Sequence, residues 1–375
     1  MNDRLTPLRC TECGAVYDDR WRCRCGGVLE YAEPLFAAMN DGSVRSGDPP
    51  ASSTFDSRDG LWSFRRFLPE EPHVTLGEGL TPLVSAPAWD ASFKLEYVFP
   101  TGSFKDRGAT TTISRAIAAD AKTVLEDSSG NAGAAIATYA ARAELDARIY
   151  VPAAAKRSKL RAIERAGATP VPIEGPRSAA TDACIEAVDS GEGWYASHAW
   201  NPAFLAGTAT IAYEIALQRD WEVPDALVTP LGHGTLFLGA YWGFRALREI
   251  GWTDSMPRLL GAQAAGYAPI ADRFEGRADE RSDADGRNDV ADGIQITEPV
   301  REREIHEAIE ATEGDAIAIG TAAVERHLDR LHRSGFYVEP TCAIAPAALE
   351  RYRDRGTIAS GDDVVVPLTG SGLKQ

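Results

Sequence analysis

From about residue 94 to the C-terminus, short apolar runs alternate with alanine-rich stretches of helical character. The runs have the length and the β-branched and aromatic content typical of buried strands. They are KLEYVF (94–99), TVLED (123–127), ARIYVP (147–152), TPVPI (169–173), WYAS (194–197), ALVTPL (226–231), RLLGAQ (258–263) and DVVVPLTG (363–370). Strand and helix in alternation favour mostly parallel sheets covered by helices, so we predict an α/β protein. A length of 375 residues allows two or three domains.

The charge and hydropathy of the chain exclude several classes of partner. The net charge is −16, and an acidic surface repels phosphate backbones, so we expect no nucleic-acid partner. No apolar run approaches the roughly 20 residues of a membrane span, and the N-terminus lacks the features of a signal peptide. We therefore expect a cytoplasmic protein. The scarcity of lysine and the abundance of Asp and Glu resemble halophilic proteins, in which acidity maintains solubility.

Four of the six cysteines lie within residues 10–25. They form a CxxC pair and a CxC pair, each followed by glycine, and they are Cys10, Cys13, Cys23 and Cys25. Tetrahedral zinc takes four thiolates from two such knuckles, and the glycines permit the sharp turn behind each pair. Clustered cysteines in a cytosolic chain favour a metal over disulfides. We predict a structural zinc ribbon within residues 1–35, with four reduced, metal-free cysteines as the alternative.

Two segments lack the periodicity of regular elements. Residues 36–75 are rich in Gly, Pro, Ser and Asp, which predicts a linker or wrapping segment. Residues 273–293 are acidic and have no apolar period, which predicts an exposed loop.

Lys105 lies in the stretch TGSFKDRG, at the start of a small-residue helix. The chain has six lysines among 39 basic residues, so arginine would be the ordinary choice for charge alone. A primary amine forms a Schiff base with a carbonyl, and a guanidinium does not. Lys105 is therefore a candidate for covalent catalysis, with an ordinary surface lysine as the alternative.

Three further motifs follow predicted strands. Residues 128–131 (SSGN) and 232–235 (GHGT) each precede a helix, and such a junction exposes backbone N–H groups that favour an anion. For the first motif, the alternative is a capped, alanine-rich core helix. For His233, which could act as a catalytic base, the alternative is a spacer or hydrogen-bond donor in the loop. Residues 369–372 (TGSG) lie beyond a valine strand, at the edge where open α/β sheets bind ligands.

In this order the motifs resemble the fold-type-II family of pyridoxal-phosphate enzymes, and among them the threonine synthases. The resemblance extends from GEGLTPL (77–83) to the C-terminus, and the cysteine ribbon resembles an extension of some members. It implies a two-domain α/β fold, with a large cofactor-binding domain (76–100 and 206–375) and a small domain (101–205). Relatives of this fold are usually homodimers.

The resemblance implies roles for the motif residues. Lys105 is the implied catalytic residue, bonded to pyridoxal 5′-phosphate and moving protons at the substrate. Asn131 is expected to contact the cofactor hydroxyl, and Thr369 its ring nitrogen. The expected ligands of the cofactor phosphate are Gly232, His233, Gly234 and Thr235. The expected contacts of the amino-acid substrate are Ser128, Ser129, Gly130 and Ser197.

The chain departs from the threonine synthase pattern where the substrate phosphate is held. The positions that have a hydroxyl, an arginine and an asparagine in the family hold Ala132, Phe204 and Leu236 here. Loss of a bidentate arginine weakens phosphate binding considerably. The neighbouring cations that could replace it are Arg107, Arg157 and Lys159.

The activity implied is conversion of O-phosphohomoserine and water to threonine and phosphate, by a threonine synthase or a diverged paralogue. One alternative is a serine or threonine deaminase, or a β-replacement enzyme that acts on a serine derivative. A different class is a non-catalytic sensor that uses the ribbon to bind a partner.

Overall fold

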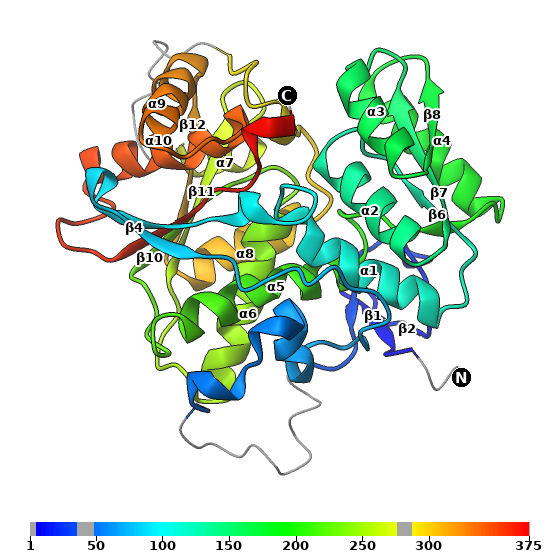
Figure 1. Ribbon diagram of the computed structural model, residues 1–375, viewed down its shortest axis with the longest axis horizontal. Helices are drawn as coiled ribbons and strands as arrows, with labels where there is room; N and C mark the ends of the chain where they lie inside the picture. The colour runs from blue at the N-terminus through cyan, green and yellow to red at the C-terminus, as the bar shows by residue number, and fades with distance from the viewer. Residues whose placement is uncertain (1–4, 36–48, 276–286, 375) are drawn as a thin grey trace. The chain divides into compact units, whose positions relative to one another are not determined.

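The computed structural model describes residues 5–35, 49–275 and 287–374. Residue contacts divide the chain into two compact units. Unit 1 comprises Met1–Arg45, Phe55–Gly79 and Lys105–Thr210, and unit 2 comprises Ser46–Thr54, Leu80–Phe104 and Ile211–Gln375. Both units combine helices with parallel strands (Figure 1), which confirms the predicted α/β class.

Unit 1 contains a parallel sheet with the strand order β8-β7-β6-β9. Its strands are β6 (Thr123–Glu126), β7 (Asp146–Pro152), β8 (Thr169–Ile173) and β9 (Trp194–Tyr195). Its helices are α1 (Lys105–Ala118), α2 (Asn131–Arg142), α3 (Arg157–Arg165), α4 (Arg177–Asp189) and the first part of α5 (Pro202–Leu217). Strands β6, β8 and β9 fall within the predicted runs TVLED, TPVPI and WYAS, and β7 begins one residue before the run ARIYVP. Small side chains allow α1 and α2 to pack closely, with Ala109 and Ile113 in the same core as Ile136 and Ala140.

A three-stranded antiparallel sheet forms the N-terminal part of unit 1, in the order β2-β1-β3. The strands are β1 (Leu8–Cys10), β2 (Val16–Tyr17) and β3 (Leu29–Tyr31). Within the segment predicted as a linker or wrapping segment, Ser57–Phe67 forms the 3-10 helix η3, whose Leu61 and Trp62 are buried in one cluster with Leu8 and Leu29. Residues 36–48 of that segment lie outside the described residues.

Unit 2 contains a sheet with the strand order β12-β11-β10-β13-β5-β4, parallel except for the β4–β5 pair. The strands are β4 (Leu83–Ala86), β5 (Ala91–Lys94), β10 (Ala226–Pro230), β11 (Arg258–Ala264), β12 (Asp315–Ile319) and β13 (Val364–Pro367). The helices are α6 (Thr235–Glu249), α7 (Pro269–Glu275), α8 (Glu302–Ala311), α9 (Thr321–Arg333) and α10 (Pro340–Asp354). Helices α9 and α10 pack together and α6 packs with α8, and α6, α8 and α10 all contact β10 or β11. In the described parts of the chain, every helix is too short or too polar for a membrane span.

Two predictions about local structure were partly wrong. The run KLEYVF leaves the sheet after Lys94, because the Thr81 hydroxyl donates to the buried Glu96 carboxylate (2.6 Å) and the chain turns into a short 3-10 helix, Glu96–Val98. In the loop predicted for 273–293, α7 continues to Glu275, and Asn288 is buried and donates to the carbonyl of Ile319 (2.9 Å). Residues 276–286 of that loop lie outside the described residues.

Candidate active site and metal centre

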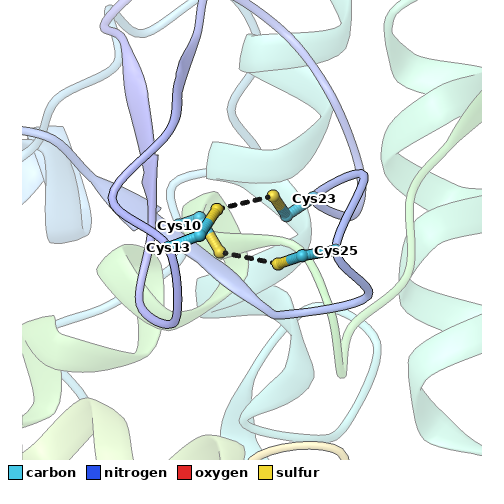
Figure 2. A group of neighbouring side chains, drawn as sticks. All are labelled: Cys10, Cys13, Cys23 and Cys25. Atoms are coloured by element: carbon cyan, nitrogen blue, oxygen red, sulfur yellow. Dashed lines mark hydrogen bonds between the residues drawn. The ribbon is translucent and has the colours of Figure 1, made fainter.

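The four ribbon cysteines converge on one point (Figure 2). All four sulfur atoms lie within 4.8 Å of one another. The Sγ–Sγ distances are 3.5 Å for Cys10 and Cys25 and 3.4 Å for Cys13 and Cys23. Four sulfurs bound to zinc at about 2.3 Å in a tetrahedron would be about 3.8 Å apart, so the cluster has roughly the size of a zinc–thiolate site.

Glycines and a tyrosine support this geometry. Gly14 and Gly26 have φ angles of 72° and 93°, a left-handed backbone that favours glycine at each knuckle. The Tyr17 hydroxyl lies 3.2 Å from Cys23 Sγ and lowers the pKa of that thiol to about 6. A lowered pKa favours the thiolate, the form that binds a metal, whereas the neighbouring Cys23 and Cys10 raise the pKa of Cys25 to about 12.

Lys105 is the first residue of α1. The residues just before it, Ser103 and Phe104, pair with other residues of unit 2. The Phe104 N–H donates to the Thr369 carbonyl (3.1 Å), and Ser103 pairs with Gly370 in an isolated bridge. Two predicted motifs that are far apart in the sequence, TGSFK and TGSG, therefore meet at the residue before the lysine.

The glycine loop of unit 2 has the geometry of an anion site. Residues 232–235 follow β10 and lead into α6, and Gly234 is the N-cap, with φ 79° and no side-chain cap hydrogen bond. A Cβ on Gly234 would lie 2.6 Å from Ile305, and one on Gly232 would lie 3.1 Å from Ile294. The glycines are therefore required for packing, and N–H groups at a helix start favour an anion.

Thr369 lies at the same sheet edge, because β13 and β10 are parallel neighbours. It is buried, and its hydroxyl is 3.4 Å from Cys342 Sγ. The Cys342 thiol also accepts from the N–H of Gly370 (2.9 Å) and lies 3.1 Å from its carbonyl oxygen. Burial raises the pKa of Cys342 to about 12, so the thiol stays neutral and the hydroxyl has an uncharged neighbour.

The serine–glycine turn of unit 1 links β6 to α2. Gly130 is the N-cap without a side-chain cap hydrogen bond, and its N–H donates to Ser128 Oγ (3.2 Å). A Cβ on Gly133 would lie 1.8 Å from the Ser128 carbonyl oxygen, so the helix start packs directly on the turn. Ser197 follows β9, the parallel neighbour of β6, and is buried. Carboxyl ends of parallel strands meet at one edge, so the turn and Ser197 share an edge of the sheet.

Comparison with known proteins identifies the family. The sequence pattern described as "Pyridoxal-phosphate dependent enzyme" matches residues 74–370. The chain belongs to the pyridoxal-phosphate-dependent enzymes. This confirms the resemblance that the motifs indicated.

The curated relatives include threonine synthases along nearly the whole chain. The threonine synthase of Methanosarcina acetivorans is 32% identical over 98% of this chain and 92% of its own length. That of Methanocaldococcus jannaschii is 30% identical over the same shares, 98% and 92%. Both alignments are long enough to include the cysteine ribbon of this chain.

Solved structures with the same fold include enzymes of other activities. An L-serine ammonia-lyase from Rhizomucor miehei has a TM-score of 0.66 at 22% identity, and covers 78% of this chain and 93% of its own. A pyridoxal 5′-phosphate-dependent aspartate racemase has a TM-score of 0.65 at 24% identity, over 78% and 90%. At these identities the likeness establishes the fold alone.

The described residues of unit 2 fit the cofactor of a pyridoxal-phosphate enzyme. The start of α6 presents N–H donors and small residues where a phosphate could bind. The Thr369 hydroxyl, which lies beside a neutral thiol, could meet a heterocyclic nitrogen without adding charge. Lys105, the first residue of unit 1 after Phe104, supplies a primary amine, and Phe104 itself is bonded to Thr369 within unit 2. The donor set thus has the chemistry that the cofactor requires.

The three positions at which the resemblance implied polar ligands of a substrate phosphate are apolar and buried. Ala132, Phe204 and Leu236 are 2%, 0% and 3% exposed. The Phe204 ring packs on α1, where a Cβ on Gly108 would lie 2.2 Å from it. The Lys105 Nζ lies 5.6 Å from the centroid of this ring. The aromatic ring of Phe204 therefore lies beside the lysine side chain.

The three neighbouring cations differ in their surroundings. Arg107 is fully buried, and its Nη1 donates to Thr210 Oγ1 (2.9 Å). Arg157 is exposed at the start of α3. The side chain of Lys159 lies outside the described residues. Arg107 thus already has a hydrogen-bond partner within the protein, and it is a less suitable ligand for a substrate phosphate for that reason.

A buried polar pair in unit 1 was not predicted from the sequence motifs. His198 Nδ1 lies 2.7 Å from Glu126 Oε1, and both side chains are buried. The only signal in the sequence was position, since Glu126 precedes the SSGN turn by two residues and His198 follows Ser197.

Proposed function

We propose that this chain is a threonine synthase-type lyase, which converts O-phosphohomoserine and water to threonine and phosphate. The similarity to curated threonine synthases, about 30% identity over 98% of the chain, is the observation that supports this most strongly. The likeness to solved ammonia-lyases and racemases covers less of the chain, 78%, at 24% identity or below.

The site residues take the following roles in this proposal. Lys105 would bond covalently to the cofactor and would afterwards exchange protons with the substrate carbons. The N–H groups of the loop 232–235 would hold the cofactor phosphate, Asn131 would contact the cofactor hydroxyl, and Thr369 would face the ring nitrogen. Ser128, Ser129, Gly130 and Ser197 hold the substrate carboxylate and neighbouring groups. The starts of α2 and α6, whose N-cap residues make no side-chain cap hydrogen bond, support both anion sites.

The reaction requires proton transfers that an amine can perform. Bound pyridoxal phosphate supplies an electron sink for the pair left at the substrate α-carbon. Lys105 removes protons from Cα and then from Cβ, the Cγ–O bond breaks, and phosphate leaves with its electron pair. Water then adds at Cβ, and Cγ and Cα regain protons. The Phe204 ring beside Lys105 helps to exclude bulk water from the amine.

Deamination of serine or threonine is the second candidate, and one observation favours it. Ala132, Phe204 and Leu236 offer no polar ligand to a substrate phosphate. A deaminase needs no such ligand. A β-replacement enzyme that acts on a serine derivative without a phosphate needs no such ligand either.

We also propose that the ribbon binds one structural zinc ion through Cys10, Cys13, Cys23 and Cys25, since four thiols fill a tetrahedron and leave no position for water. The domain division is proposed as 76–100 with 206–375 for the cofactor domain and 101–205 for the small domain. A homodimer in the cytoplasm completes the proposal.

A substrate panel tests the function. Purified protein with pyridoxal phosphate is offered O-phosphohomoserine, O-phosphoserine, serine and threonine separately, and phosphate, threonine, oxo acid and ammonia are measured for each. Threonine and phosphate from O-phosphohomoserine support the synthase. Oxo acid and ammonia from serine or threonine, without use of O-phosphohomoserine, would replace it with the deaminase.

A further inference from the structure

A buried carboxylate–imidazole pair lies at the sheet edge of unit 1. Glu126 is the last residue of β6, and His198 follows β9, its parallel neighbour. His198 Nδ1 is 2.7 Å from Glu126 Oε1, and the His198 N–H donates to Oε2 (3.3 Å). The two residues are 0% and 5% exposed. The carboxylate thus fixes both the backbone and the ring of His198.

This pairing determines which ring nitrogen can react. A buried carboxylate without a partner is costly, and burial, reinforced by Asp127, raises the pKa of Glu126 well above its usual value. The Nδ1 contact satisfies one carboxylate oxygen and orients the ring. Nε2 is then the nitrogen through which His198 could exchange a proton with a substrate.

The pair lies close to Lys105 in the same unit. The rings of His198 and Phe204 are 6.0 Å apart between centroids, and Lys105 Nζ is 5.6 Å from the Phe204 centroid. Burial raises the pKa of Glu126, and the positive charge of Lys105 opposes this shift. Ser197, a proposed substrate contact, directly precedes His198.

We propose that His198, oriented by Glu126, is a second acid–base group, which protonates the oxygen that leaves the substrate. This inference rests on the proposed function, because it assumes a lyase with an oxygen leaving group. As the C–O bond breaks, its electron pair stays on oxygen, and the Nε2 proton of the imidazolium bonds to that oxygen. The imidazole is left neutral and regains a proton from the water that enters. Lys105 is occupied at carbon in the same cycle, so a separate acid at oxygen avoids giving one amine both tasks.

The test separates departure of the leaving group from chemistry at carbon. His198→Gln is compared with wild type in D₂O, with whichever panel substrate the wild type consumes. We expect kcat for release of the leaving group to fall by about 10²–10⁴-fold. Because Lys105 is untouched, substrate recovered from the variant should contain deuterium at Cα, as read by NMR. His73→Gln, the same change at an exposed histidine of unit 1, should behave like wild type.

Each other result overturns the proposal. Equal loss of product release and Cα labelling would mean that His198 only supports the structure, and undiminished release would mean that it has no role. If His198→Gln fails to retain the cofactor absorbance, Glu126→Gln decides instead. That variant keeps the imidazole, and should show a smaller loss of release, about tenfold, with Cα labelling retained. A wild type that consumes no panel substrate refutes the proposed function itself.

Discussion

Trp21 of the ribbon and Tyr195 of β9 lie edge to face, with their ring centroids 5.3 Å apart. Trp21 also lies edge-on to Trp200, at 5.2 Å. The Tyr195 hydroxyl donates to Asp127 Oδ1 (2.9 Å), and Asp127 directly precedes Ser128 of the proposed substrate turn. A continuous set of contacts within unit 1 therefore leads from the ribbon to that turn.

Trp21→Ala should weaken substrate binding as well as the ribbon. Two edge-to-face pairs are lost, which should lower the free energy of unfolding by about 1–3 kcal/mol. Because the substrate turn loses its support, we expect KM for the amino acid to rise severalfold while the cofactor absorbance is unchanged. Trp21→Phe keeps an aromatic ring and should show smaller effects. A lowered Tm with an unchanged KM would show that the ribbon does not influence the turn.

Removal of the proposed zinc ion should distinguish the ribbon thiols from the other two cysteines. Cys184 and Cys342 are fully buried, and burial raises the pKa of both thiols, so they should react slowly with a thiol reagent in the native protein. We expect few fast thiols before a chelator is added, and four per chain afterwards, together with one released zinc ion. Unfolding should expose all six. Four fast thiols in carefully prepared protein without chelator would contradict the zinc site.

Borohydride reduction should attach the cofactor to Lys105, because reduction makes the proposed covalent bond permanent. Peptide mapping by mass spectrometry is expected to find the adduct on Lys105. Lys105→Arg keeps the positive charge but removes the primary amine, so it should lose activity by at least about 10²–10⁴-fold. An adduct on any of the other five lysines would refute the assignment.

Gly108→Ala should destabilise the enzyme, because the added methyl group would clash with the Phe204 ring. An added Cβ would lie 2.2 Å from the Phe204 ring, and overpacking of this kind costs about 1–3 kcal/mol. The displaced ring lies beside Lys105, so the cofactor absorbance should also shift. Phe204→Leu makes room, and the double variant should recover part of the lost Tm. If the two substitutions are additive, Phe204 is not the residue that makes Gly108 necessary.

Most of the fold could be predicted because parallel strands buried on both faces have short, continuous apolar sequences. ALVTPL contains β10 and DVVVPLTG contains β13, and both of these strands are buried along their whole length. The end of KLEYVF could not be predicted in this way, because it depends on the bond between Thr81 and Glu96, which no apolar pattern reveals. Likewise DAIAI (315–319), which forms β12, was not among the predicted runs, because it is short and rich in alanine.

The family and the ribbon cysteines could be recognised from local motifs, because glycine turns and paired thiols have strict spacing. The Glu126–His198 pair could not, since its members are 72 positions apart and meet only because β6 and β9 are neighbours. The burial of Arg107 was also invisible, because its partner Thr210 lies on another helix. Such contacts depend on strand order and helix packing, which a single sequence does not specify.

Simultaneous measurement of threonine and inorganic phosphate, with O-phosphohomoserine as the sole amino acid, tests the proposed reaction. If this chain is a threonine synthase, the two products should form in equal amounts, and both should disappear with Lys105→Arg. No phosphate from O-phosphohomoserine, together with ammonia and oxo acid from serine or threonine, would contradict it.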